Sequence, residues 1–169
     1  MAKNLTGTLS NVRAVIGSLM AYRASLLPKM ELVAERLYNE YGIPTVNNLY
    51  TAADGDSKKP YQTYFQISQS GNKVIGTLFL EGEEVAFVEF GAGIHYNSPA
   101  GTSPHPKGVQ LGYTIGSYGY GQGQYDSWEY KGDDGELHTS LGTEATMPLL
   151  NANQEMRDAL VKICKEVFA

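Results

Sequence analysis

Cysteine is almost absent from this sequence, since Cys164 is the only one among 169 residues. One cysteine allows neither a disulfide within the chain nor a zinc site of several cysteines, and we expect Cys164 to be a small apolar helix residue rather than a nucleophile. The chain start lacks an apolar run followed by a cleavage signal, and no run approaches the roughly 20 apolar residues of a membrane span. We therefore expect a protein that is neither exported nor embedded in a membrane.

Positive charge is also scarce. The formal net charge is -5, whereas proteins that grip nucleic acid normally carry a basic patch. The acidity is concentrated in residues 81–144, where ten acids and two bases give a local charge of -8. This pattern is typical of a solvated acidic surface, and it also fits an acidic wall facing a molecule that must not adhere. The ten acids are Glu81, Glu83, Glu84, Glu89, Asp126, Glu129, Asp133, Asp134, Glu136 and Glu144.

Apolar residues make up 42% of the chain, which suffices for a packed core, and the length fits one domain over residues 1–169. Glycine and tyrosine are abundant, with 19 and 12 copies. Eleven of the glycines fall between Gly91 and Gly135. That part of the chain therefore differs in composition from the rest.

Apolar residues recur every three or four positions through most of residues 1–42, which predicts a long helical segment. Pro28 lacks a backbone donor, so we expect a kink there or a split into two helices. Gly42 and Pro44 are expected to end this segment. Residues 45–60 read as a loop, with a short strand at 46–50 as an alternative.

The clearest local pattern is a β-hairpin within residues 61–90. Two β-type runs, 61–68 and 73–81, are joined by a Gly-Asn pair that tolerates positive φ. The second run is apolar on both faces, which predicts a central strand. Residues 83–90 suit a short helix or a strand by their periodicity.

The rest of the chain divides into three parts. Residues 91–127 read as an extended loop rich in glycine and tyrosine, and residues 128–140 as a second hairpin with an Asp-Gly turn. Residues 146–168 have helical spacing, with Thr146 as the expected N-cap and a proline in the first turn. We therefore expect an α+β domain with a small antiparallel sheet packed against an N-terminal and a C-terminal helix.

No motif for catalysis or for a cofactor stands out. The sequence lacks a nucleophile elbow, and its glycine-rich run lacks the Lys-Ser/Thr pair of a phosphate loop. The three histidines do not have the spacing of metal ligands on one helix or hairpin, so we predict no catalytic, cofactor or metal site. One alternative is a metal-dependent cell-wall hydrolase that would use His95, His105 and Asp126.

Aromatic side chains in and after the glycine-rich loop are suited to contact, because tyrosine offers a large area at low entropy cost. Beside an acidic segment they fit a protein interaction surface, a flexible loop without a partner, or a carbohydrate-binding face of a tail accessory module. The residues concerned are Tyr113, Tyr118, Tyr120, Tyr125 and Trp128.

Residues 85–93 read Val-Ala-Phe-Val-Glu-Phe-Gly-Ala-Gly. This motif resembles the hallmark of a family of head-to-tail joining, or tail-completion, proteins of long-tailed bacteriophages, with Ala92 where the family usually has threonine. The resemblance continues through Trp128, Gly142 and the Ala-Thr-Met-Pro-Leu-Leu-Asn-Ala sequence of residues 145–152. It spans roughly residues 61–169, in the same order.

The resemblance implies a virion structural protein made in the host bacterial cytoplasm, without catalysis. It implies a ring, usually of six subunits, in the neck between the connector and the tail-terminator or tail-tube proteins. DNA would pass through this ring without adhering, because lumen-facing acids would repel it. The residues expected to matter for assembly are Glu89, Phe90, Gly91 and Gly93, with Phe90 in the core, and the expected lumen-facing acids are Glu129, Asp133, Asp134 and Glu136.

Overall fold

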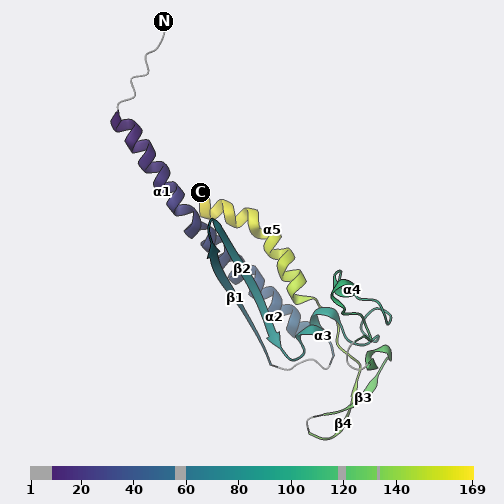
Figure 1. Ribbon diagram of the computed structural model, residues 1–169. Helices are drawn as coiled ribbons and strands as arrows, with labels where there is room; N and C mark the ends of the chain where they lie inside the picture. The colour runs from purple at the N-terminus through teal and green to yellow at the C-terminus, as the bar shows by residue number, and fades with distance from the viewer. Residues whose placement is uncertain (1–8, 56–59, 118–120, 133) are drawn as a thin grey trace.

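The computed structural model describes residues 9–55, 60–117, 121–132 and 134–169, and its fold is α+β as expected (Figure 1). Helices line one face of a long two-stranded ribbon, and a second, shorter ribbon projects from one end of the molecule. The elements in chain order are α1 (Leu9–Leu37), a π-helical turn η1 (Tyr38–Gly42), α2 (Ile43–Ala52), β1 (Tyr61–Ser70), β2 (Lys73–Gly82), α3 (Val85–Phe90), α4 (Gly108–Leu111), a 3-10 turn η2 (Gln122–Gln124), β3 (Trp128–Lys131), β4 (Leu137–Ser140) and α5 (Pro148–Phe168).

The first helix is continuous through Pro28, so the split considered there does not occur. The end expected at Gly42 is wrong, as are the loop over residues 45–52 and the alternative strand at 46–50, because η1 and α2 prolong the helical path to Ala52. Residues 53–55 and 60 lie outside the helices and strands, as expected for a loop. Pro44 lies in the first turn of α2, where a missing N–H costs little. Gly42 has helical φ and ψ, and its missing side chain leaves room for the Met156 sulfur.

The ribbon β1–β2 confirms the predicted hairpin, with Tyr61 opposite Gly82 and Gly71 at positive φ in the turn. The expectation that β2 is a central strand is wrong, since within the described residues it pairs with β1 alone. Both of its faces are apolar for different reasons. The inner face packs on the helices, whereas Phe79 on the outer face stacks on Tyr64 with ring centroids 4.8 Å apart.

The core lies where α2, β2, α3 and α5 meet. Val46 and Tyr50, four residues apart on α2, are buried there together with Val88 of α3 and Ala152 of α5. Leu80 of β2 completes this cluster, so residues from four elements fix the place of the short helix α3 against the start of α5.

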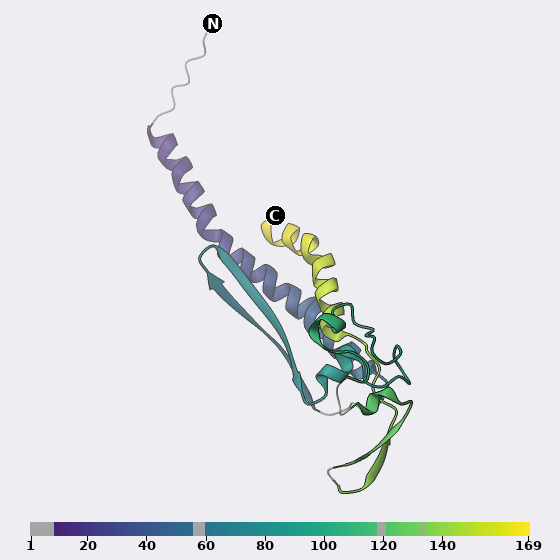
Figure 2. The same ribbon diagram turned by 45° about the vertical axis from the view of Figure 1, so that its right-hand side comes forward.

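The segment 91–127, expected to be an extended loop, is compact in its described residues. Ile115 is buried, and its N–H and C=O pair with the backbone of Thr102 and Gly101 at 2.8 Å. The segment also contains α4 and η2 and folds against the end of the molecule that holds α3 (Figure 2). Its described part is therefore a folded element of this chain.

Two parts of the chain project from this body. The beginning of α1 extends past the ends of α5 and of the β1–β2 ribbon, while the β3–β4 hairpin projects from the opposite end (Figures 1 and 2). Every residue from 12 to 24 is exposed. We call residues 12–24 the N-terminal arm.

Candidate functional site

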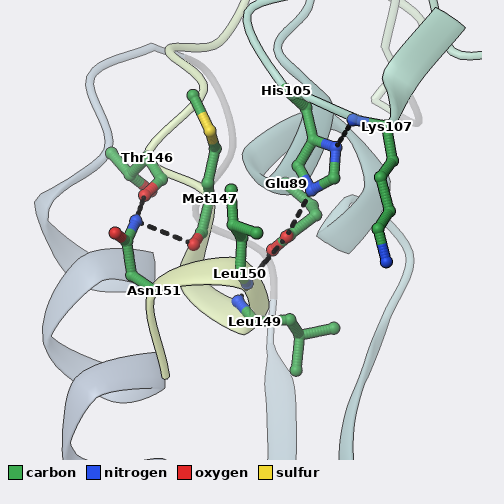
Figure 3. Close-up of polar contacts among 8 residues, drawn as sticks. All are labelled: Glu89, His105, Lys107, Thr146, Met147, Leu149, Leu150 and Asn151. Atoms are coloured by element: carbon green, nitrogen blue, oxygen red, sulfur yellow. Dashed lines mark hydrogen bonds and ion pairs between the residues drawn. The ribbon is translucent and has the colours of Figure 1, made fainter. Parts of the chain in front are cut away.

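The motif at residues 85–93, which we call the resemblance motif, contains the short helix α3. Its glutamate, Glu89, connects α3 to α5. Glu89 is 6% exposed, and its two carboxylate oxygens accept the backbone N–H groups of Leu149 at 2.8 Å and Leu150 at 3.1 Å (Figure 3). The first N–H groups of a helix have no partner within that helix, so an acid there is a cap and also complements the helix dipole. Glu89 therefore caps α5 from another helix.

Thr146, the expected N-cap of α5, does not serve that role. Its hydroxyl donates instead to the backbone C=O of Leu49 at 2.9 Å. Met147 follows in the left-handed conformation at φ 53°, and Pro148 begins the helix. The sharp change of direction at Met147 turns the Thr146 side chain towards α2 and leaves the end of α5 to Glu89.

His105 completes the surroundings of Glu89. Its Nε2 lies 3.4 Å from a Glu89 carboxylate oxygen, and its Nδ1 accepts the backbone N–H of Lys107 at 3.1 Å (Figure 3). An accepting Nδ1 places the imidazole proton on Nε2, where it faces the carboxylate. Burial raises the pKa of Glu89, while hydrogen bonds from Leu149, Leu150 and His105 oppose that rise.

The two glycines of the motif have the positive φ expected for the exit from α3, 81° at Gly91 and 79° at Gly93. A side chain at Gly93 would also collide with Trp128, whose ring carbon Cζ3 lies 2.9 Å from where its Cβ would be. Trp128 is half-buried, with its ring close to the backbone of Gly93. The motif thus connects α3 to the second hairpin.

Asn97 holds the chain in place after α3 through side-chain hydrogen bonds, a role that the sequence did not predict. Its amide nitrogen donates to the backbone C=O of Gly93 at 3.0 Å and of Thr143 at 2.8 Å, and its amide oxygen accepts the N–H of Ala145 at 3.0 Å. Its only signal in the sequence is an amide side chain soon after two glycines. Nothing local points to partners almost 50 residues away.

Phe90, expected in the core, is half-buried at its edge. Its ring stacks on Tyr113 at a centroid distance of 4.2 Å and meets the edge of His105 at 4.7 Å. Tyr113 thus packs on a residue of its own chain, whereas Tyr125 is 66% exposed. Tyr118 and Tyr120 lie outside the described residues.

The expected lumen-facing acids belong to the projecting β3–β4 hairpin. Glu129 and Glu136 are exposed, and Asp134 pairs with the imidazole Nε2 of His138 at 2.9 Å. The pKa of Asp134 is lowered by this histidine and by the backbone N–H of Glu136. Asp133 lies outside the described residues.

The ligand set of the hydrolase alternative is not assembled. His95 contacts Asp126 at 3.1 Å, while His105 is buried against Glu89. Within the part of the chain that the structure describes, no three histidine, cysteine or acidic side chains are placed to share a metal ion. Cys164 is half-buried on α5.

Apolar side chains are exposed at several places on the described residues, among them two that lie at opposite ends of the molecule (Figure 1). One is a shallow hollow of about 410 Å³ between α3, α4 and the start of α5, lined mainly by Leu80, Val85, Phe90, Leu111 and Leu149. The other is the N-terminal arm. Its large apolar side chains, each close to half exposed or more, are Val12, Val15, Ile16, Leu19, Met20 and Tyr22.

Comparison of the chain with protein families, curated sequences and solved structures finds no match. Among the described helices, none combines the length and apolar character that crossing a membrane requires.

Proposed function

We propose that this chain is a structural protein that joins head and tail in a long-tailed bacteriophage, by forming a ring in the neck of the virion. The proposal starts from the motif at residues 85–93 and its resemblance to head-to-tail joining proteins. Three residues of that motif occupy positions that restrict the residue type: Glu89 caps α5, and Gly91 and Gly93 have positive φ. These roles fit a motif that preserves an architecture.

The N-terminal arm is the observation that carries the proposal. Val15, Leu19 and Met20 are 59%, 62% and 67% exposed on one side of a helix that extends away from the body. Contiguous exposed apolar surface of this kind marks a protein interaction site. Burying it against a neighbour would contribute roughly 25 cal/mol per Å². Assembly is therefore the role that best uses this part of the chain.

The acidic hairpin fits the passage of DNA. Glu129, Asp134 and Glu136 stand on a projection with a single base, Lys131, within the hairpin strands. Carboxylates facing a channel repel the phosphates of passing DNA and prevent adhesion. If these acids lie on the outer rim of the assembled ring, this part of the proposal is wrong.

Removing the gene from the phage that encodes it tests the proposal. We expect heads filled with DNA and separate, complete tails in electron micrographs, because each part assembles before joining. Supplying the wild-type protein is expected to restore joined particles. Normal infectious particles without the protein would contradict a role in joining.

A further inference from the structure

The hollow between α3, α4 and α5 has the character of a receptor for an apolar helix. Its lining is mostly aliphatic and aromatic and includes Leu111 of α4, and Val109 of the same helix, 66% exposed, extends the apolar surface beyond it. Amphipathic helices bind such surfaces through side chains spaced three and four residues apart. The hollow is therefore suited to bind a helix with a stripe of large apolar side chains.

The N-terminal arm has that stripe. Val12, Val15, Ile16 and Leu19 follow one another at helical spacing on one side of α1. Thirteen helical residues span about 20 Å, whereas the four-residue helix α4 spans about 6 Å. The arm lies at the end of the molecule opposite α3 and α4, so it cannot reach the hollow of its own chain (Figures 1 and 2).

The charges of the two surfaces are complementary. Arg13 and Arg23 lie on the arm, and the first acid of the chain is Glu31. Within the lining of the hollow, Glu89 and Lys107 balance each other, but Glu83 and Glu84 directly precede the lining residue Val85. Opposite charges beside two surfaces favour the correct pairing and speed the encounter.

We infer that the N-terminal arm of one copy docks in the α3–α4–α5 hollow of the next copy. This inference rests on the proposed ring, and it names the contact that builds it. Because donor and acceptor are different surfaces at opposite ends of the chain, the contact is head-to-tail. Repeated head-to-tail contacts close into a ring when the rotation between neighbours allows it.

Two other contacts compete with this one. Arms of two copies can pair with each other along their apolar stripes, which gives a symmetric dimer. An arm can also dock on the outer face of the β1–β2 ribbon, where Tyr64 and Phe79 are stacked and Ile75 is 48% exposed. A cross-linking experiment separates the three contacts.

The experiment uses single-cysteine chains in which Cys164→Ser removes the native thiol. One chain carries Leu19→Cys on the arm, a second Val109→Cys beside the hollow, and a third Thr77→Cys on the outer face of the ribbon. Pairs of chains are mixed at about 1 mM, where even weak contacts are populated. The mixtures are then oxidised, and disulfide-linked dimers are identified by mass.

We expect the arm and hollow variants to cross-link at least about tenfold more than the arm and ribbon variants, because a docked arm raises the effective concentration of the paired thiols. Dominant cross-links in the arm variant alone, or with the ribbon variant, would overturn the inference. A chain that stays monomeric and does not cross-link would overturn it as well. Each of these results leaves the head–tail proposal to be decided by the gene-removal experiment.

Discussion

The Glu89 carboxylate accepts the backbone N–H of Leu149 at 2.8 Å. A side chain of the six-residue helix α3 therefore caps the N-terminus of α5, 60 residues further along the chain. The same carboxylate accepts a second N–H, from Leu150. This contact joins the hairpin and α3 to α5 at the edge of the core. The resemblance motif is therefore, in this fold, a device that holds two distant elements together.

Replacing Glu89 by alanine is expected to lower the free energy of unfolding by about 3 kcal/mol, because two part-buried N–H groups and the imidazole lose their acceptor. Chemical denaturation measures the loss. The matched control is Glu129→Ala, an exposed glutamate on β3, for which we expect a change within about 0.5 kcal/mol. Equal effects of the two substitutions would contradict the capping role.

Glu89 also predicts an unusual pH dependence. Burial raises its pKa in the folded state, so the folded chain holds this proton more tightly than the unfolded chain. Its contribution to stability is therefore fully present below its unfolded pKa and declines as pH rises through the folded pKa. Measured from about pH 4 to about pH 8, the stability of the wild type minus that of Glu89→Gln is expected to fall. A difference that rises with pH would show that the pKa is lowered.

Asn97 is predicted to be as important as Glu89, although it lies in a loop. Asn97→Asp replaces a donor to three backbone carbonyls by a carboxylate oxygen that faces them, and we expect a loss of about 3 kcal/mol. Asn48→Asp, on the exposed side of α2, is the control and is expected to change little. Thermal unfolding of both variants distinguishes them. Similar melting temperatures would mean that the Asn97 contacts contribute no stability.

The contact between the ribbon and the first helical segment depends on a glycine. A Cβ at Gly76 would lie 2.6 Å from the Tyr38 hydroxyl oxygen, so Gly76→Ala is expected to cost about 1–3 kcal/mol by overpacking. Gly17→Ala, where a Cβ meets nothing within 4 Å, is expected to leave stability unchanged or slightly raised. Denaturation of the two variants tests this contrast. No loss in Gly76→Ala would imply that Tyr38 does not pack on β2.

The arm is expected to serve assembly and not folding. Leu19→Glu places a charge in its apolar stripe and is expected to abolish self-association while leaving the melting temperature of the monomer unchanged. Ala21→Glu, exposed on the opposite side of the same helix turn, is the matched control. Sedimentation velocity compares the two with the wild type. If both variants assemble like the wild type, the apolar stripe is not a contact surface.

Local patterns predicted the elements whose signals are complete in a short stretch of sequence. The alternation before and after Gly71 predicted the β1–β2 hairpin, and the apolar spacing before Phe168 predicted α5. The glycines after Phe90 predicted a positive-φ exit, which the structure confirms. In each case the residues that determine the local structure lie within or next to that structure in the sequence.

The features that the sequence did not predict depend on contacts between residues far apart in the chain. Gly42 and Pro44 are common helix terminators, but the close approach of Met156 and the first-turn position of Pro44 make them compatible with a helical path. The cap of α5 comes from Glu89, whereas the local rule favoured Thr146. The partners of Asn97 are equally distant. Such partners are fixed by tertiary packing, which no short stretch of sequence encodes.

Electron microscopy of intact virions, with the chain marked by a bound antibody, shows where in the particle this protein lies. We expect a closed ring of this chain between head and tail, with the β3–β4 hairpin directed at the DNA channel. Finding the chain only at the tail tip, on the head surface, or outside the virion would contradict the head–tail proposal.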